Sequence, residues 1–251
     1  MRDELSSHDI LTLWFTKIPS ALRAMQYAAR LVGKKPEHFW RIPRWQGGSL
    51  PWQRTDDRQS GVTAGVSAVE NRFVNRGAGV VDLDNDGNPD LFFVTGNVYP
   101  EVEAQVPTYP FKTPRVVFRN LGGGRFEEVL DLAGPAIAEP HASRGCAFGD
   151  FDNDGDIDIL IVNLNETPSL LRNDLKSGNH WLKVKLIGTR SNRSAIGTRI
   201  TCLYGNKKQA QKVMAQPSFY SSNDRRLHFG LGKAITADLE IRWTNGFTQA
   251  I

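Results

Sequence analysis

The sequence predicts a mainly β protein: stacked β-repeats, then a small antiparallel β-sandwich or barrel, with a short helical region in front. Two observations predict this class. Two nine-residue acidic stretches, DLDNDGNPD (82–90) and DFDNDGDID (150–158), each join a small-residue segment to a short apolar run rich in β-branched and aromatic residues. Downstream, HWLKVKLIG and LEIRW alternate apolar and polar residues with the period of two that marks half-buried strands.

Length and composition are those of a soluble globular protein. The chain has 251 residues, of which 40% are hydrophobic and 23% charged. No run approaches the ~20 apolar residues that span a bilayer. The N-terminus carries early acids and an apolar stretch broken by Lys17, so it is a poor signal peptide. Cys146 and Cys202 define no disulfide framework, and we expect both to be small buried hydrophobes.

Charge is segregated along the chain. Residues 1–80 hold 12 basic and 7 acidic residues, a net of +5, and residues 81–175 hold 6 and 17, a net of −11. Residues 176–251 hold 13 and 3, a net of +10. The two acidic stretches explain the middle segment. The basic C-terminal third needs an explanation of its own.

The first 60 residues predict a helical or irregular region. Residues 1–35 read as helical, because Pro19 stands at a plausible first helical position and Gly33 and Pro36 are stop signals. A packed or peripheral helix is favoured over a helix on a membrane surface. Residues 41–60 are rich in turn formers and indicate a linker or an irregular cap.

Residues 73–178 form a twofold β-repeat. Each copy has a small-residue strand, an acidic loop, an apolar strand (LFFV or ILIV) and a further strand ending in Arg-Asn. The register offset is 150 − 82 = 68 residues. Repeats of this kind stack into larger arrays.

Each acidic loop has the pattern of a hard-cation site. Positions 1, 3, 5 and 9 are aspartates, position 6 is a glycine that permits a sharp turn, and position 7 can offer a backbone carbonyl. Several carboxylates with one carbonyl suit Ca²⁺ before Mg²⁺. The predicted ligands of two calcium sites are Asp82, Asp84, Asp86, Asn88 and Asp90, then Asp150, Asp152, Asp154, Asp156 and Asp158.

The loops begin like EF-hand loops but end differently. An EF-hand has a bidentate Glu at position 12 and a helix on each side, whereas position 12 here is Phe93 or Ile161 in an expected strand. The alternative interpretation is a pair of acidic turns that bind nothing, because Asp, Asn and Gly also dominate ordinary turns. Two copies in the same register favour metal binding.

These residues resemble known modules. The acidic loop that follows the strand segment GCAFG (145–149) resembles the FG-GAP/VCBS repeat of calcium-binding β-propellers. The segments GNHWLKVKLIGTRSNRSAIGTRI, SSNDRRLHFGLG (221–232) and LEIRWTNG (239–246) resemble the ASPIC/UnbV domain, which we expect over residues 179–251. Together the resemblance covers roughly residues 76–251.

The resemblance implies a partial β-propeller, calcium on the eight aspartates and an extracellular or periplasmic location. Such propellers usually have about seven blades and an export signal, whereas this chain shows two repeats and no signal peptide. We therefore expect an N-terminally truncated relative, or a partial propeller capped by the N-terminal region. It further implies a non-enzymatic role in adhesion or recognition, with structural calcium and an unknown protein or glycan ligand.

The basic C-terminal third suggests a rival function. Its charged loops and edge strand could bind a polyanion such as an acidic glycan, RNA or phospholipid headgroups, although no nucleic-acid motif accompanies them. Internal docking against the acidic middle, or ordinary lysines on an edge strand, explains the same charge. The candidate anion-binding residues are Arg190, Arg193, Lys207, Lys208, Arg225 and Arg226.

An enzyme is the least favoured class. The five histidines are scattered, and HExxH, GxSxG and CxxC are all absent from the sequence. His141, just before the second acidic loop, is best read as a loop histidine with a hydrogen-bond partner. Aspartates that hold calcium are poor general bases unless a substrate also reaches the metal.

Overall fold

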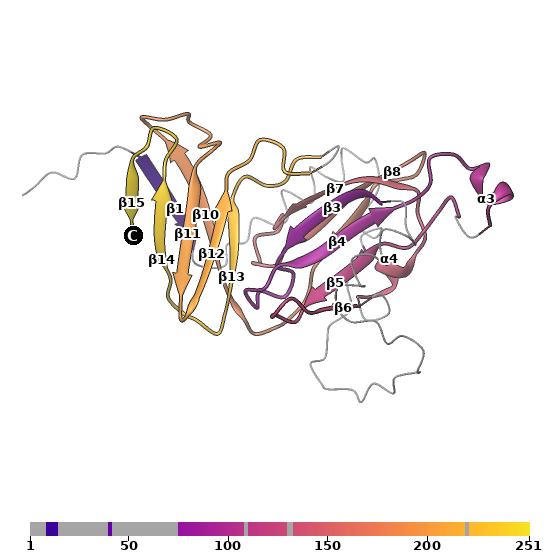
Figure 1. Cartoon of the computed structure of the whole chain (residues 1–251), viewed down its shortest axis with the longest axis horizontal. Coiled ribbons are helices and arrows are strands. Elements are labelled where there is room, and N and C mark those ends of the chain that lie inside the picture. Colours follow the sequence, from indigo (N-terminus) through magenta and orange to yellow (C-terminus); the bar gives the residue numbers. More distant parts are fainter. Residues whose placement is uncertain (1–8, 15–39, 42–74, 108–109, 130–132, 219–220) are drawn as a thin grey trace, which may run out of the picture.

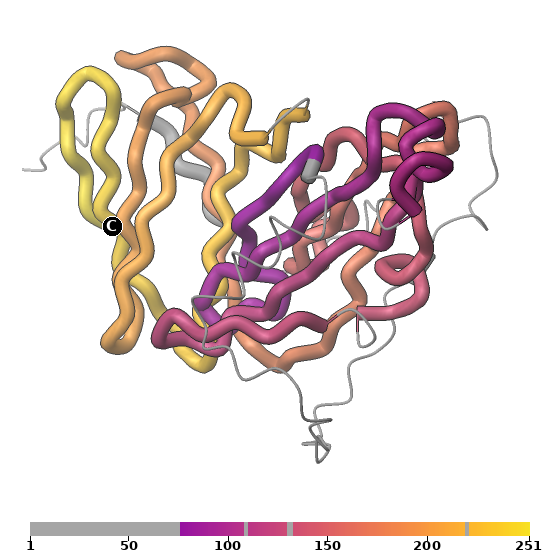
Figure 2. Tube along the Cα trace, turned by 45° about the vertical axis from the view of Figure 1, so that its right-hand side comes forward, coloured from indigo at the N-terminus to yellow at the C-terminus, as the bar shows by residue number. Residues whose placement is uncertain are grey.

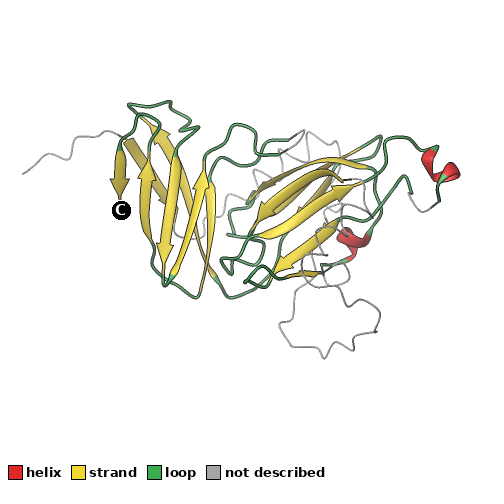
Figure 3. Ribbon diagram, viewed as in Figure 1, coloured by secondary structure: helices red, strands yellow, loops and turns green. Residues whose placement is uncertain are grey.

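The protein is mainly β, as predicted. The computed structural model describes residues 9–14, 40–41, 75–107, 110–129, 133–218 and 221–251, and these form four sheets (Figures 1 and 3). The helices among them are two single turns, α3 (Val102–Gln105) and α4 (Pro135–Ala138). None in this described part of the chain has the length and apolar character of a membrane-crossing segment.

The first repeat sheet is an antiparallel meander. It contains β3 (Asn75–Val81), β4 (Asp90–Thr95), β5 (Val116–Asn120) and β6 (Phe126–Glu128) in that order. The acidic loop joins β3 to β4, and their facing ends are Val81 and Asp90. Alternate residues of β4 point into the core, since Phe92 and Val94 are fully buried.

The second repeat sheet copies this arrangement. Its antiparallel strands are β7 (Ser143–Gly149), β8 (Asp158–Asn163) and β9 (Ser169–Arg172), and β2 (Trp40–Arg41) lies parallel to β9 at the edge. Gly149 faces Asp158 where β7 and β8 meet the acidic loop. The predicted repeat of strand, acidic loop, strand and strand is confirmed.

The two repeat sheets share one core, and their strands β3 and β7 approach closely. The rings of Phe92 and Phe148 meet edge to face, with centroids 5.8 Å apart. Phe148 lies directly over Gly79, where a Cβ atom would overlap its ring. Cys146 is buried beside them, as the sequence predicted. Glycine therefore sets the distance between the sheets.

The C-terminal region is a sandwich of two sheets. One has the order β1-β10-β13, with β1 (Asp9–Trp14), β10 (His180–Gly188) and β13 (Leu227–Gly232). The other has the order β12-β11-β14-β15, with β11 (Arg199–Tyr204), β12 (Lys207–Lys212), β14 (Asp238–Arg242) and β15 (Thr248–Ala250). These strands close no barrel. The tube in Figure 2 shows the sandwich beside the repeat sheets.

The sandwich core follows the predicted alternation. Its buried residues include the three apolar residues predicted to point inward from β10, and the three from β14 and the residue after it. They are Leu182, Val184, Leu186, Leu239, Ile241 and Trp243. Cys202 is also buried there, as predicted.

The helical prediction over residues 1–35 is wrong for Asp9–Trp14. These residues form β1, antiparallel to β10, with Asp9 opposite Gly188 and Trp14 opposite Lys183. The tertiary contact overrides the local signal, because β10 would otherwise present unpaired backbone groups along one edge. The remainder of the predicted helix, and most of the predicted linker over residues 41–60, lie outside the described residues.

Gly79 gives a direct test of this packing. We expect Gly79→Val to lower the free energy of unfolding by about 1–3 kcal/mol, because the added side chain overlaps the Phe148 ring. Urea denaturation measures the change. Ala78→Val is the matched control, since Ala78 is exposed on the same strand. An equal loss in both variants would contradict the packing argument.

Candidate metal centres

The first aspartate of each acidic loop organises the turn. Asp82 Oδ1 accepts the backbone N–H of Asp86 at 3.1 Å, and its Oδ2 accepts that of Gly87 at 2.8 Å. In the second loop Asp150 accepts the N–H groups at positions 5 and 6, at 3.1 and 2.9 Å. Because the side chain satisfies the turn's own donors, the sequence folds locally into the same loop twice.

Two positions in each loop adopt left-handed backbone conformations. Position 4 is Asn85 (φ 60°) or Asn153 (φ 62°), and asparagine tolerates this region better than most residues. Position 6 is Gly87 (φ 85°) or Gly155 (φ 99°). The DNDG sequence thus supplies the conformations that bring alternate side chains together.

The last aspartate of each loop ties the strands together. Asp90 accepts the N–H of Leu83 at 2.9 Å and that of Asn120 at 2.8 Å, one with each carboxylate oxygen. Asp158 makes the corresponding bonds to position 2 of its loop and to Asn173. The Arg-Asn ending found in both repeats therefore has a structural role, since its asparagine N–H closes the loop.

Three carboxyl groups converge in each loop. Their ligand atoms lie within 4.8 Å of one another in two groups, Asp82, Asp84 and Asp86, and Asp150, Asp152 and Asp158. Four of these six side chains are buried. A carboxylate has about four acceptor sites, so the backbone N–H bonds leave others for a ligand. An oxygen-only donor set of this kind fits a hard divalent cation.

The protein environment disfavours charge on these carboxylates. Burial raises the pKa of Asp82 to about 7, and the neighbouring Asp84 and Asp86 add to this rise. The backbone hydrogen bonds from Gly87 and Asp86 lower the pKa but do not offset the rise. Burial likewise raises the pKa of Asp90 and Asp158 to about 8 each, and that of Asp156 to about 7. Each group would gain from a bound cation, because a nearby positive charge favours the ionised form.

Both loops pack against the C-terminal sandwich at their glycines. A Cβ atom on Gly155 would overlap the indole of Trp181, and one on Gly87 would meet the hydroxyl of Tyr204. Gly230 of β13 has the same relation to the carboxylate of Asp82. The glycines at position 6 are needed for the backbone conformation and for this close approach.

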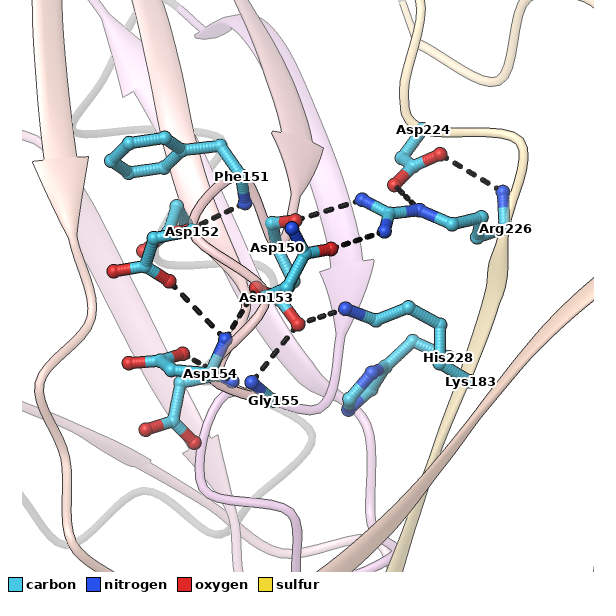
Figure 4. Close-up of polar contacts among 12 residues, drawn as sticks. Asp150, Phe151, Asp152, Asn153, Asp154, Gly155, Lys183, Asp224, Arg226 and His228 are labelled. Atoms are coloured by element: carbon cyan, nitrogen blue, oxygen red, sulfur yellow. Dashed lines mark hydrogen bonds and ion pairs between the residues drawn. The ribbon is translucent and has the colours of Figure 1, made fainter. Parts of the chain in front are cut away.

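The sandwich supplies cationic groups to the second loop (Figure 4). Lys183, on the outer face of β10, is 3% exposed and forms an ion pair with Asp150. Arg226 donates to the Asp150 carbonyl at 2.8 Å, to the Asn153 side chain and to Asp224. Burial, and then the nearby Arg226, lower the pKa of Lys183 to about 7. The ion pair of the first loop comes from its own repeat and not from the sandwich, because Arg119 pairs with Asp84 at 3.0 Å.

Asn85 connects the two loops and the sandwich. Its Nδ2 donates to the Gly155 carbonyl at 3.1 Å and to the Asp156 carboxylate at 3.0 Å, both in the second loop. Its Oδ1 lies 2.6 Å from His228 Nε2 in β13. Burial, with Lys183 and then Arg226 adding to it, lowers the pKa of His228 to about 3, so the imidazole is neutral and Nε2 donates.

Comparison with known proteins supports the same division of the chain. Residues 82–161 match the FG-GAP-like repeat family, and residues 188–251 match the ASPIC and UnbV family. The two matches follow one another along the chain in this order. The resemblance inferred from the sequence is confirmed.

Three relatives match about two thirds of the chain. Cartilage acidic protein 1 of Homo sapiens is 28% identical over 170 residues, which is 66% of this chain and 24% of the relative. The Mus musculus protein of that name gives 28% over 170 residues, and the Xenopus tropicalis protein 26% over 179 residues. The chain spans about a quarter of the length of these relatives. The descriptions of these families and relatives name no catalytic activity.

Six of the ten predicted calcium ligands lie in the two groups of converging carboxylates. Asp90, Asp154 and Asp156 lie outside the two groups of converging carboxylates. Asp154 is exposed, and Asp156 is engaged by Asn85 of the other loop. The ligand set as a whole stays a prediction.

The predicted anion-binding residues of the ASPIC/UnbV region lie in three places. Lys208, Arg225 and Arg226 line one cleft against the repeat sheets. Lys207 donates to the Asp86 carbonyl of the first loop, and Arg190 and Arg193 follow β10 elsewhere. Outside this region, His141 has a hydrogen-bond partner, as expected, and it is Glu166 Oε2 at 2.6 Å.

Sequence reasoning missed the cationic partners of the FG-GAP-like loops. Alternation placed Lys183 on the outer face of β10 without showing that a loop 33 residues away covers that face. The sequence did contain a signal for Asn85 and Asn153, because both loops have asparagine at position 4, and asparagine is one of the few residues that adopt a left-handed backbone conformation readily. Arg119 and Arg172 occupy matching places, but Arg172 pairs with Asp174 rather than with its loop.

Without a cation, stability should fall as pH rises from about 4 to about 8. The folded-state pKa values of Asp82, Asp90 and Asp158 lie above the ordinary value of 3.8, so these groups bind more protons in the folded chain than in the unfolded chain. The lowered pKa of His228 acts in the opposite direction below about pH 6.5, but it is one group against three. Urea denaturation in a chelator at pH 5 and pH 8 measures this. Equal or greater stability at pH 8 would contradict the raised pKa values.

Replacing the buried ammonium beside the second loop should also be costly. Lys183→Met leaves the Asp150 carboxylate buried without its partner, and we expect the free energy of unfolding in a chelator to fall by about 3–5 kcal/mol. Lys185→Met is the control, because Lys185 is exposed on the same strand and should change stability by about 0.5 kcal/mol or less. Similar losses in both variants would show that the ion pair stabilises nothing.

Proposed function

We propose that this FG-GAP-like, ASPIC/UnbV chain is a non-enzymatic calcium-binding recognition module. Its two repeat sheets would act as neighbouring blades of a β-propeller-like array. Two acidic loops would each hold one Ca²⁺, chiefly on Asp82, Asp84 and Asp86 and on Asp150, Asp152 and Asp158.

The observation that carries the proposal is the burial of converging carboxylates. Burying charged groups is unfavourable unless they are paired or coordinate a metal. The described ion pairs reach only Asp84 in the first group and Asp150 in the second. Bound calcium would supply the remaining positive charge, and in the second loop it would join oxygens from both ends.

Calcium in these sites would be structural. Each loop fixes the spacing of two strands and lies against the sandwich through its glycine at position 6. Neutralised loops would therefore hold the strands in register and the sandwich in place. The aspartates are committed to loop hydrogen bonds and ligation, which leaves none of them free as a general base.

The setting we propose is extracellular or periplasmic. Extracellular calcium modules bind at ~0.1–1 mM, and sites of that affinity would be empty in the cytosol. The role we propose is adhesion or recognition of a protein or glycan. The match to a family described by FG-GAP-like repeats supports the repeat architecture on which such a role would depend.

Thermal unfolding with increasing calcium tests the proposal. We expect a rise in melting temperature that magnesium does not reproduce, because ligand binding to the folded state stabilises it by mass action. Asp84→Asn and Asp152→Asn change one carboxylate in each loop at matched positions. Each should remove about half of the rise, and the double variant should remove nearly all of it.

The control variant is Asp238→Asn, which alters an exposed carboxylate in β14. It should keep the full response to calcium. Isothermal titration should give two sites for the unaltered chain and one for each single variant. No response up to several millimolar calcium would reduce the loops to acidic turns and overturn the proposal.

A further inference from the structure

A cleft of about 580 Å³ lies between the repeat sheets and the C-terminal sandwich. One wall is formed by β12 and the segment before β13, and the other by the ends of β3 and β7. Its volume is within the range of ordinary ligand sites. Figures 1 and 2 show β12 and β13 on the side of the sandwich that faces the repeats.

Three cationic side chains on one wall are uncommitted. Lys208, Lys212 and Arg225 line the cleft and are exposed, and among the described residues they have no ion-pair partner. The three carboxylates of the lining are all engaged. Asp150 pairs with Lys183, Asp224 pairs with Arg226, and Asp82 accepts two backbone N–H groups.

The segments that carry these cations are held in place. In β12 the side chain of Gln209 donates to the Gly230 carbonyl at 2.9 Å, and that of Gln211 donates to the His228 carbonyl. Side chains alternate along a strand, so Lys208 and Lys212 project from the face of β12 opposite to the face that carries Gln209 and Gln211. The segment with Arg225 is fixed because Asp224 N–H donates to the Phe148 carbonyl at 2.9 Å. A rigid arrangement lowers the cost of binding.

The spacing of the cations suits a ligand with several charges. Lys208 and Lys212 are four residues apart on one strand, which separates their Cα atoms by about 13 Å. One sulfate or carboxylate cannot reach both. Exposed apolar side chains lie in the same lining, among them Val80 and Met214. They suit a ligand with apolar faces between its acidic groups, as pyranose rings have.

We propose that this cleft binds an acidic oligosaccharide, with its sulfate or carboxylate groups on Lys208, Lys212 and Arg225. The inference rests on the recognition role proposed above but not on calcium binding, and the two are tested by separate measurements. It assigns three of the thirteen basic residues of the C-terminal third to an external ligand.

Nucleic acid is the less favoured ligand. Proteins that hold single strands stack the bases on aromatic side chains, and the described lining of the cleft contains no tyrosine or tryptophan. Its Phe148 is buried in the core rather than presented to the cleft.

The test is binding of a sulfated heparin hexasaccharide, measured by titration calorimetry in a chelator at low and moderate salt. The triple variant Lys208→Glu/Lys212→Glu/Arg225→Glu should bind at least tenfold more weakly than the unaltered chain. A second variant with glutamine at the three positions should show a smaller loss in the same direction. Both changes lie on exposed side chains and should leave the melting temperature unchanged.

The matched control is Lys185→Glu/Arg190→Glu/Arg193→Glu, which changes net charge equally outside the cleft. It should retain most of the affinity. Equal weakening in the two triple variants would show a general charge effect and overturn the proposal. So would no binding to the unaltered chain, or tighter binding of a twelve-nucleotide RNA or a polyglutamate peptide of similar charge.

Discussion

The structure depends on one constraint: the negative charge of the carboxylates gathered at the ends of β3 and β7 must be neutralised, by protonation or by a nearby positive charge, because the C-terminal sandwich covers them. Asp82, Asp90, Asp150 and Asp158 are each at most 7% exposed. Backbone N–H groups of the loops meet part of the need, and the rest falls to cationic groups brought from elsewhere. The glycines at position 6, the Arg-Asn strand ends and the buried Lys183 all follow from this requirement.

The segregation of charge along the sequence has two physical causes. Part of the basic C-terminal third does dock against the acidic middle, since Lys183, Lys207 and Arg226 contact the loops directly. Only one of these contacts is an ion pair with a loop carboxylate, however, and the others are hydrogen bonds to carbonyl or amide oxygens. Internal complementarity therefore explains the side of the sandwich that touches the repeats. The cations that line the cleft need a separate explanation.

Local signals predicted what depends on local sequence. The alternation in HWLKVKLIG and LEIRW gave the sandwich strands, and the DNDG loops between apolar runs gave both hairpins, because turn chemistry and the period of side chains are properties of a few neighbouring residues. The pairing of β1 with β10 and the bond from Asn179 to the Asp84 carbonyl join residues about a hundred or more positions apart. Nothing in the periodicity of either segment encodes its partner. Lys183 is the clearest case: the pattern placed it on the correct face of its strand, but only the tertiary structure shows that this face is covered.

The two acidic loops are alike in sequence but differ in their electrostatic surroundings. In the first, the guanidinium of Arg119, from the same repeat, pairs with the buried Asp84. In the second, the buried ammonium of Lys183 reaches the aspartate that also organises the turn, and Arg226 lies behind it. A cation entering the second loop would share Asp150 with a charge that the sandwich supplies, and like charges repel strongly where water is excluded. Under the proposed function, occupancy of that loop would be coupled to the position of the sandwich, whereas the ion pair of the first loop lies within its own repeat. The two copies of the motif therefore differ in the charges around them, because the ion-pair partner of the first loop comes from its own repeat and that of the second comes from the sandwich.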